Sequence, residues 1–497
     1  MSALPRGWIN ATIGEITRIN PRTEGPVNPD LSVTFVPMQA VSDKIGAIVD
    51  PKVRPFREVA RGYTRFKEGD VIFAKITPCM ENGKSAVVRN TLAGLACGST
   101  EFYVLRPQMG ISPDFIWHYI RQRRFRANAE RSMTGAVGHR RVPPDYLEAS
   151  SFVLPPLREQ SRIVEQIDNL SAKSARARER LDHIPRLVEK YKQAVLMAAF
   201  QGRLTKEWRG ESRIDECPNK SEIKEERSQL LAAHGQRLIE TDGQQSLGDT
   251  IPFDVPNSWR WERAEAVCGF ITKGTTPSAA NMGRSTSGVP FLKVYNLTFD
   301  GIIDFSVDPT YVSLSTHKVE LKRSRVVPGD VLMNIVGPPL GKVGVVSDEY
   351  PEWNINQAIA VFRPVASLSS SYLSKWFLTD MLANWAASRA KATSGQSNLT
   401  LEICRNLPVP FCGVREQTEI VRRIDVAFAW IDRLAAEATS ARKLIDHFDQ
   451  AVLAKAFRGE LVPQDPNDEP ASALLERIRA ERAAAPAAKR GRRKASA

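Results

Sequence analysis

Residues 158–168 read REQSRIVEQID, and the pattern returns 257 residues later, at 415–425, as REQTEIVRRID. Seven of these eleven positions are identical. At the same offset YKQAVLMAAFQGRL (191–204) returns as FDQAVLAKAFRGEL (448–461), with eight of fourteen positions identical. Solenoid proteins repeat every 20–50 residues, roughly, and the offset of 257 residues is far longer. It therefore indicates a duplicated half-molecule with an approximate internal twofold, which suits a target with two parts, such as duplex DNA.

The repeated stretches lie in two segments whose apolar residues alternate steps of four and three, the spacing of a coiled coil. Each segment covers about 45 residues, or roughly 65 Å as one helix. Gly202 and Gly459 are expected to end them, and Pro185 should kink or break the first. Because such an apolar stripe cannot stay in water, the two helices are predicted to pack antiparallel on each other. The residues predicted to pack between the helices or against a partner subunit are Ile163, Ile167, Leu181, Ile184, Val188, Tyr191, Phe200, Ile420, Ile424, Ile431, Leu434, Ile445, Phe448 and Phe457.

The sequence before each helical segment has a mixed character. Each half opens with a proline and a tryptophan three residues later, at Pro5 and Trp8 and again at Pro256 and Trp259. Strand-like runs and short helices follow: turns leading into strands at 68–73 and 328–333, strands at 102–107 and 359–364, and helices near 115–126 and 372–388. The predicted fold class is α+β, with two α/β domains, each followed by a long helix, and the helices forming an antiparallel coiled coil with a pseudo-twofold internal repeat.

These patterns predict six segments along the chain. A polar linker and a basic, partly disordered tail follow the two helices, with helical stretches near 220–239 and 473–478. The predicted boundaries are 1–156 for the first domain, 157–204 for the first helix, 205–255 for the linker, 256–412 for the second domain, 413–461 for the second helix and 462–497 for the tail.

The charge of the chain favours an anionic partner. The formal net charge is +13 and the isoelectric point is near 9.5. In a chain without export signals such a balance points first to nucleic acid. Part of the charge lies in the tail, where five of the six residues 489–494 are cations, and such a cluster would touch phosphates without reading sequence.

Composition also bounds the compartment. Mean hydropathy is −0.29 with 42% hydrophobic residues, enough for real cores, and no apolar run approaches the roughly 18 residues of a membrane span. The opening MSALPRGW lacks the apolar core of a signal peptide. We therefore expect a cytoplasmic protein without a membrane association. The six cysteines form no CxxC pair, so reduced structural thiols are expected and a zinc site is not.

Catalytic motifs are missing from the sequence. Residues 79–85, CMENGKS, resemble a phosphate-binding loop, but Pro78 stands where that motif needs glycine. HExxH and GxSxG are absent, and the segment 143–146, PPDY, departs from the loop of an amino-methyltransferase. We therefore predict a chain that is not an enzyme and holds no metal or cofactor of its own.

Polar loops are the features that stand out in both halves. Asn, Gln, Arg, Lys, Ser and Thr side chains are the ones that hydrogen-bond to base edges and phosphates. The loops at equivalent places differ between the halves, whereas the helices repeat closely, which suits one frame holding two readers of different targets. The predicted DNA-contacting residues are Lys75, Thr77, Glu81, Asn82, Lys84, Thr100, Arg140 and Arg141 in the first half, and Lys273, Lys293, Asn334, Lys342, Asn356, Gln357, Gln396 and Asn398 in the second.

The doubled helix motif resembles a known family. Residues 154–168 (LPPLREQSRIVEQID), continued by 193–204 (QAVLMAAFQGRL), resemble the spacer region of type I restriction–modification specificity subunits, and 415–461 resemble it again, although Cys412 and Gly413 replace the two prolines. The tail segment 465–471, DPNDEPA, is also similar to this family. The resemblance covers the whole order of target-recognition domain, helix, target-recognition domain and helix.

The resemblance implies a non-catalytic subunit that reads double-stranded DNA. Each target-recognition domain would read one part of a split site, and the helical pair would fix the unread spacer. Two DNA methyltransferase subunits would dock along the helices, and restriction and translocase subunits would join them. S-adenosylmethionine, ATP and Mg²⁺ would be used by those partners, and the methylating partner would flip the target adenine out of the stack.

Three other functions remain as alternatives. The first is the specificity polypeptide of a related system whose partner carries both methylase and nuclease. The second is an enzyme fused to a recognition domain, which the missing motifs disfavour. The third is a structural coiled-coil adaptor, which leaves the charge and the two divergent domains unexplained.

Overall fold

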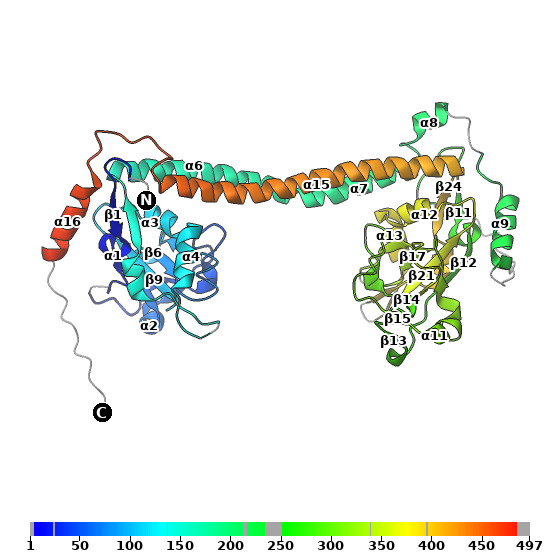
Figure 1. Cartoon of the computed structure of the whole chain (residues 1–497), viewed down its shortest axis with the longest axis horizontal. Helices are drawn as coiled ribbons and strands as arrows, with labels where there is room; N and C mark the ends of the chain where they lie inside the picture. The colour runs from blue at the N-terminus through cyan, green and yellow to red at the C-terminus, as the bar shows by residue number, and fades with distance from the viewer. Residues whose placement is uncertain are drawn as a thin grey trace. The chain divides into compact units, whose positions relative to one another are not determined.

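The protein is described by a computed structural model that covers residues 4–22, 25–136, 138–211, 216–233, 251–337, 339–393 and 396–484 (Figure 1). It forms two compact units. Unit 1 is Met1–Asp182 with Thr439–Ala497, and unit 2 is His183–Ala438. The helix α15, Val414–Ala456, belongs to both units. Among the described residues, no helix is both long and apolar enough to cross a membrane.

Unit 1 contains two four-stranded sheets, ordered β2-β9-β6-β7 and β4-β3-β8-β5, and the two-stranded pair β1-β10. All pairs are antiparallel except β3 with β8. The strands are β1 Ile9–Thr12, β2 Thr17–Ile19, β3 Ser32–Val36, β4 Lys52–Pro55, β5 Thr64–Lys67, β6 Val71–Ala74, β7 Ser85–Val87, β8 Leu95–Gly98, β9 Phe102–Pro107 and β10 Ser151–Leu154.

Unit 2 repeats this plan with additional short strands. Its sheets are ordered β12-β21-β17-β19, β13-β15-β14-β20-β16 and β18-β23-β22, with the pair β11-β24. The strands are β11 Arg260–Arg263, β12 Cys268–Lys273, β13 Met282–Gly283, β14 Val289–Leu292, β15 Tyr311–Val312, β16 Arg325–Val326, β17 Val331–Asn334, β18 Val336–Gly337, β19 Val343–Val345, β20 Trp353–Ile355, β21 Ile359–Pro364, β22 Lys391–Thr393, β23 Gln396–Asn398 and β24 Pro408–Phe411.

The central strands of each unit are buried on both faces. In β6, Val71 and Phe73 face a core shared with helices, whereas Ile72 and Ala74 face a second core against the other sheet. In β17, Val331 and Leu332 divide between two cores in the same way. Successive side chains on a strand point to opposite faces, so a strand between two cores reads as a continuous apolar run. This confirms the strands predicted at these places.

Each unit carries two short helices where the sequence predicts one. They are α3 Pro113–Ile120 and α4 Arg123–Arg131 in unit 1, and α12 Ser370–Phe377 and α13 Asp380–Ala387 in unit 2. In unit 2 a new cap divides the pair: the Thr379 hydroxyl, between α12 and α13, accepts from Leu382 N–H. The remaining short helices are α1 Ile13–Ile16, α2 Phe56–Val59, α5 Pro144–Ala149, α8 Lys206–Glu211, α10 Ala264–Val267, α11 Leu314–Lys318 and α14 Leu401–Arg405.

The first long helix breaks where proline predicts it. Helix α6, Leu157–Asp182, ends one residue before α7, Ile184–Phe200, and Pro185 lies in the first turn of α7. Proline lacks the N–H that would continue the hydrogen-bond ladder. Gly202 and Gly459, at φ +68° and +73°, follow the ends of α7 and α15 in the left-handed conformation that favours glycine. Both predictions are confirmed.

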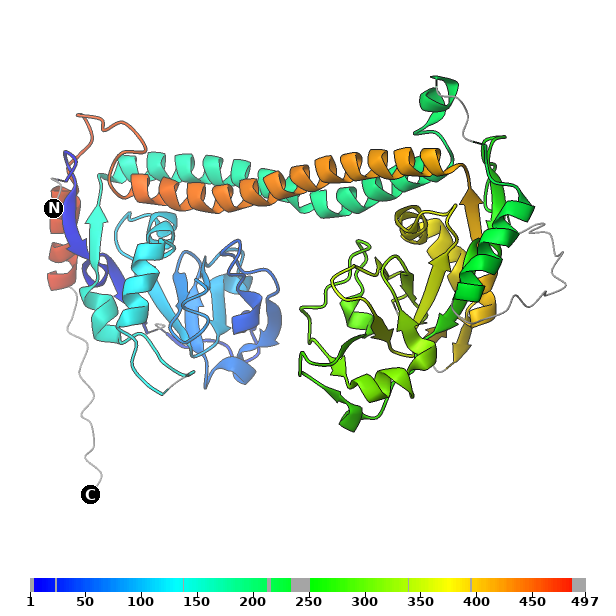
Figure 2. The same cartoon turned by 45° about the vertical axis from the view of Figure 1, so that its right-hand side comes forward.

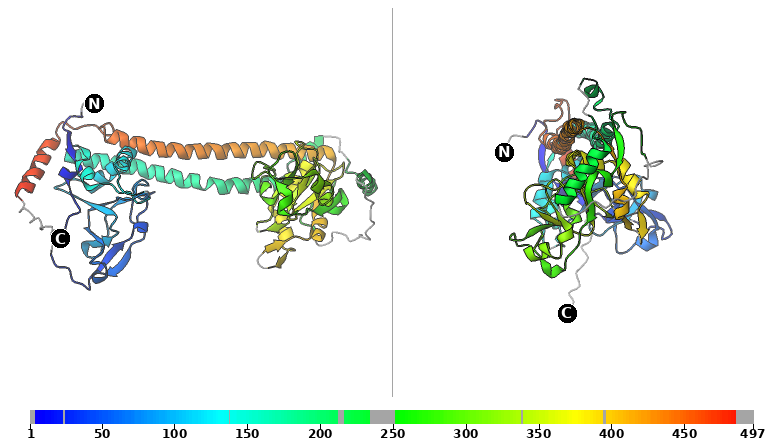
Figure 3. Two further views of the ribbon diagram at one scale, coloured as in Figure 1. Left: turned by 60° about the horizontal axis from the view of Figure 1, so that its bottom comes forward. Right: turned by 90° about the vertical axis from the view of Figure 1, so that its right-hand side faces the viewer.

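The long helices run antiparallel within each unit (Figures 2 and 3). In unit 1, Arg178 of α6 binds Asp446 and Asp449 of α15 at 2.9 and 2.5 Å, and Arg442 binds Asp182. The residue numbers of the α15 partners fall as the residue numbers along α6 rise, so the two helices run antiparallel. In unit 2, Lys192 of α7 binds Asp432 of α15 at 2.7 Å.

The linker and the tail contain helices that pack on the domains. Helix α9, Lys220–Ala233, buries Ile223 and Leu231 in unit 2, and α16, Ala471–Ala484, buries Leu474 and Ile478 in unit 1. The predicted helix at 473–478 is thus confirmed and longer. The rest of the stretch predicted to 239, and the basic tail residues 485–497, lie outside the described residues.

Candidate nucleic-acid interface

Three segments of unit 1 that are distant in sequence meet beyond the end of β6. Lys75 N–H donates to Glu101 O at 2.9 Å, and Thr77 N–H donates to Arg140 O at 3.0 Å. Ile76 and Arg141 form an isolated antiparallel bridge. The structure therefore brings together three loops that the sequence predicts to contact DNA, at 75–84, 98–101 and 134–141; residue 137 lies outside the described residues.

Acidic side chains hold the arginines of this surface. Arg141 binds Glu101 through two hydrogen bonds of 2.9 and 2.8 Å. The hydrogen bonds from Arg141 hold the pKa of the Glu101 carboxyl below its usual range. Glu81 accepts from the Thr77 hydroxyl at 3.0 Å and lies 3.5 Å from Arg140. The Thr77 hydroxyl holds the Glu81 carboxylate in place, and this carboxylate in turn orients Arg140 in the unbound protein.

The remaining predicted residues of unit 1 differ in how free they are. Asn82 and Thr100 are exposed. The Lys75 ammonium lies over the Tyr103 ring, 5.3 Å from its centroid. Lys84 donates to Met38 O at 3.1 Å. Asn82 and Thr100 are therefore ready for a ligand, whereas the two lysines would have to leave a partner.

Part of the predicted set of unit 2 lies at the ends of β12 and β20. Lys273 and Gln357 are exposed there, and Gln357 N–H donates to the Thr276 hydroxyl at 3.4 Å. Asn356 accepts from Ala358 N–H through its side chain at 3.3 Å. Lys273 and Gln357 thus present free side chains on neighbouring strand ends, while Asn356 shapes the turn that carries Gln357.

The position of Asn334 does not support the DNA contact that the sequence predicts for this residue. Its side chain is fully buried. The side-chain amide donates to Val336 O and Pro339 O at 3.3 and 2.9 Å, and its oxygen accepts from Lys342 N–H at 2.8 Å. Asn334 therefore closes the loop after β17 from inside, and reaching DNA would cost three hydrogen bonds.

The other residues predicted in unit 2 are two lysines with polar partners and two residues of strand β23. Lys293 lies 3.7 Å from Asp308, and Lys342 donates to Val294 O at 3.5 Å. Gln396 and Asn398 belong to β23, which pairs with β18 and β22. The Asn398 side-chain oxygen is buried without a hydrogen-bond partner.

The repeated tryptophan and glutamate meet in unit 1. Trp8 Nε1 donates to Glu159 Oε2 at 3.0 Å across a buried contact, and Gln464 donates to Oε1 at 3.3 Å. Burial raises the pKa of the Glu159 carboxyl. The opening of the domain is thereby tied to the first turn of α6. We name this tryptophan–glutamate contact, with the groups that bind the same glutamate, the joint.

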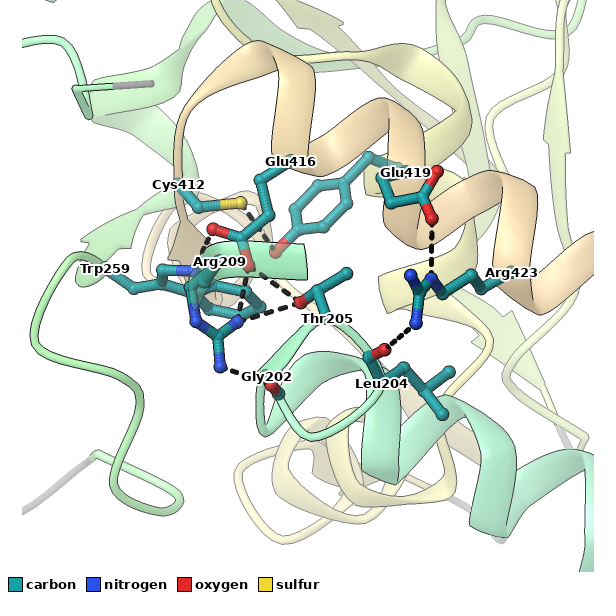
Figure 4. Close-up of polar contacts among 10 residues, drawn as sticks. Gly202, Leu204, Thr205, Arg209, Trp259, Cys412, Glu416, Glu419 and Arg423 are labelled. Carbon is teal, nitrogen blue, oxygen red and sulfur yellow. Dashed lines mark hydrogen bonds and ion pairs between the residues drawn. The ribbon is translucent and has the colours of Figure 1, made fainter. Parts of the chain in front are cut away.

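Unit 2 has the same joint with more partners (Figure 4). Trp259 Nε1 donates to Glu416 Oε2 at 2.8 Å, and Glu416 Oε1 accepts from Thr205 at 2.7 Å and from Arg209 at 2.5 Å. Arg209 also donates to Gly202 O at 2.5 Å. The repeated motifs were evident in the sequence, but their pairing across about 150 residues was not, because nothing local connects them.

The glutamine that follows each glutamate binds backbone. Gln417 donates to Cys412 O and Ser367 O at 2.8 and 2.9 Å and accepts from Ser369 N–H at 2.8 Å. Gln160 donates to Pro155 O at 3.1 Å and accepts from Ser112 N–H at 3.3 Å. The repeated Arg-Glu-Gln motif therefore fastens the domain to its helix.

The residues predicted to pack along the long helices differ in how far this chain buries them. Tyr191, Leu434 and Phe448 are 63%, 42% and 47% exposed, so they are not buried between the helices of this chain, and their packing against a partner subunit stays a prediction. A two-helix contact buries one narrow seam, whereas the helix ends are also covered by the domains. The buried residues are Ile163, Ile167, Phe200, Ile420, Ile424, Ile431 and Phe457, and the half-buried ones are Leu181, Ile184, Val188 and Ile445.

Comparison with known proteins finds relatives that are all specificity subunits of type I restriction enzymes. The chain is 25% identical to the type I restriction enzyme EcoEI specificity subunit of Escherichia coli, over 90% of this chain and 82% of the relative. It is 24% identical to the EcoKI specificity subunit of Escherichia coli strain K12, over 99% of both chains, and 29% identical to the EcoBI subunit, over 74% and 72%. No family model matches the chain.

Solved structures share the fold. The HsdS subunit of Thermoanaerobacter tengcongensis matches with a TM-score of 0.58 at 23% identity, over 92% of this chain and 98% of that one. A chain from a study of assembly and conformational transition of a type I restriction–modification system matches with a TM-score of 0.62 at 22% identity, over 93% and 100%.

Two sheet-rich domains joined to long repeated helices define the fold class of the HsdS subunits. Taken with the curated relatives, this confirms the resemblance drawn from the helix motifs. Over most of its length the chain is similar to the specificity subunits of type I restriction enzymes.

The two joints predict unequal effects of the same substitution. Trp8→Phe removes a donor from Glu159, which keeps one side-chain amide, and should destabilise unit 1 by about 1–3 kcal/mol. Trp259→Phe should cost less, because Arg209 and Thr205 still satisfy Glu416. Amide hydrogen exchange in the first turns of α6 and α15 measures the two effects separately. Equal loss of protection in both turns would contradict the unequal partners.

Proposed function

We propose that this specificity subunit reads a bipartite site in double-stranded DNA, with one target-recognition domain for each half-site. The observation that carries this proposal is the contrast between its repeated and divergent parts. Joint and helix residues return in both halves, whereas the loops beyond β6 and β17 carry different polar side chains. A shared frame with different loops suits two readers of different base sequences.

The base-reading groups belong to loops that a rigid sheet positions. In unit 1, Asn82, Thr100 and Arg141 are exposed where three loops meet. An amide or a guanidinium can bind a purine edge through two hydrogen bonds. Arg141 is held by Glu101, so binding a base exchanges one acceptor for another. Unit 2 offers Lys273 and Gln357 from the ends of its own strands.

The long helices set the spacer between the half-sites and dock two methylating subunits. The exposed apolar residues that do not pack within the chain support this docking. Leu187 and Tyr191 of α7 are 43% and 63% exposed, and Leu444 and Phe448 of α15 are 67% and 47% exposed. The second pair lies 257 residues after the first. Exposed apolar pairs at repeat-equivalent places fit two copies of one partner.

The chemistry of the complex belongs to the partners. The methylating subunits use S-adenosylmethionine and flip the target adenine out of the duplex, and the restriction subunits use ATP and Mg²⁺. The specificity subunit contributes recognition and assembly in the cytoplasm, without catalysis and without a cofactor of its own.

Methylation mapping tests this function directly. The chain is co-expressed with its methylating subunit, and methylated adenines are located across a host genome by long-read sequencing. The proposal expects one motif, with two specific blocks around a fixed unspecified gap. If the two chains copurify stably and no adenine is methylated, the proposed reading of DNA is refuted. If the two chains do not copurify, the structural coiled-coil adaptor becomes the better alternative.

Lengthening both helices should change only the gap. Four residues inserted after Lys173 in α6, matched by four inserted after Gln450 in α15, add about one turn, or about 6 Å. The gap should lengthen by about one or two base pairs while both specific blocks keep their sequence. The same mapping reads the result, and altered blocks would show that the helices do more than space the domains.

Charge placed on the exposed apolar pairs should remove the methylating subunits one at a time. Leu187→Glu and Leu444→Glu should each lower the stoichiometry from two methylating subunits to one, and the double variant should bind none, because a buried unpaired carboxylate opposes docking. Native mass spectrometry counts the subunits. Val319→Glu, at a residue 80% exposed outside the helices, is the control and should keep both. Loss of both subunits from either single variant would contradict two separate docking places.

A further inference from the structure

Helix α4 in unit 1 is strongly cationic. Its nine residues, RRFRANAER, include four arginines and one glutamate, and Arg121 precedes it. Among the residues that the structure describes, none of these five arginines forms an ion pair. We name Arg121, Arg123, Arg124, Arg126 and Arg131 the arginine patch.

Unit 2 contains the same helix without the charge. Helix α13, DMLANWAA, begins 257 residues after α4 and includes one aspartate and no arginine. Both helices dock in the same way: Arg123 N–H donates to Gln450 at 3.0 Å, and Asp380 N–H donates to Gln193 at 2.8 Å. Since the fold accepts either composition at this place, packing does not account for the arginines.

Two arginines of the patch are largely buried, and their burial opposes the charged form of the side chain. Arg126 donates to Glu81 O at 3.0 Å, and Arg121 donates to Lys44 O at 3.2 Å. Arg121 Nη1 and Arg126 Nε are buried without a hydrogen-bond partner. Burial and the neighbouring Arg126 lower the pKa of Arg121 to about 10. Burying neighbouring cations with unsatisfied donors destabilises the free protein, so an incoming anion would relieve them.

The patch is continuous with the predicted contact loops of unit 1. Arg126 holds Glu81, and a Cβ added to Gly83 would lie 2.7 Å from Arg126 Nη1, so helix and loop are in close contact. Arg123 and Arg124 are exposed. DNA seated on the loops would thus bring its sugar–phosphate backbone to the arginines.

We propose that Arg123 and Arg124, positioned beside Arg121 and Arg126, bind backbone phosphates next to the half-site read by unit 1, and that unit 2 has no counterpart. The inference rests on the proposed function and adds an asymmetry to it. Phosphate contacts supply affinity without sequence information. The two half-sites therefore contribute unequally: the side of unit 1 anchors the DNA electrostatically, and the side of unit 2 depends more on base contacts.

The salt dependence of binding tests the patch. The full chain, assembled with its methylating subunits, carries Arg123→Gln with Arg124→Gln, and its dissociation constant for a duplex with both half-sites is measured across a salt series. Each lost phosphate contact makes the slope of log affinity against log salt less negative by about 0.9. We expect a change of about two, with an unchanged methylation motif. Arg123→Lys with Arg124→Lys should keep the slope near wild type.

The matched control removes the same charge elsewhere in unit 1. Arg477 and Arg479 of α16 are exposed but pair with Glu469 and Glu15 at 2.6 and 2.7 Å. Changing both to glutamine alters the net charge equally and should leave the slope unchanged. An equal response to both double variants would reveal a general charge effect and overturn the local assignment.

Neutralising single phosphates locates the contact. Methylphosphonates placed one at a time along both flanks should weaken wild-type binding at certain positions. With the Arg123 and Arg124 double variant, the loss at those positions should disappear on one flank only. An unchanged slope with intact site-specific binding overturns this inference and leaves the proposed function standing.

Two further results would also overturn it. An unchanged slope with loss of a methylating subunit would identify an acidic protein surface as the occupant of the patch. Absence of site-specific binding by the wild-type complex would refute the proposed function together with the inference.

Discussion

A buried indole–carboxylate hydrogen bond, present once in each unit, is the contact on which the arrangement of each unit depends. Trp8 opens the first domain and binds Glu159, and Trp259 opens the second and binds Glu416. A buried carboxylate that loses its donors carries the full desolvation penalty. A domain therefore loses a buried hydrogen bond to its own helix if it swings away, and its loops keep a defined place relative to that helix.

This constraint explains which parts of the chain repeat and which diverge. The repeated glutamine next to each glutamate also binds backbone, so the Glu-Gln pair of the repeated motif fastens domain to helix. The loops beyond β6 and β17 are not needed for the joint and carry different side chains. Such a division allows the recognition loops to change while the frame stays the same. The arginine patch extends the divergence to a helix whose packing is shared.

The regular features of the fold could be predicted because their causes are local. Pro185 breaks α6 from α7 since its own backbone lacks an N–H, and Gly202 ends α7 in a conformation natural to glycine. The central strands read as apolar runs because both faces are buried. The helix spacing placed Ile163 and Ile424 in cores, whereas Tyr191, which follows the same spacing, is exposed in this chain. A period identifies a face of a helix, and it does not say how much of that face a neighbour covers.

The sequence by itself determined the duplication, the helical segments, the strand positions and the family. It determined these because a repeat, a period and a proline are legible within short stretches of chain. Only the tertiary structure decided that Trp8 meets Glu159, that Asn334 turns inward to close a loop, and that the arginines of α4 adjoin the loop at Glu81. Each of these joins residues far apart in the chain, and such contacts depend on how whole elements pack.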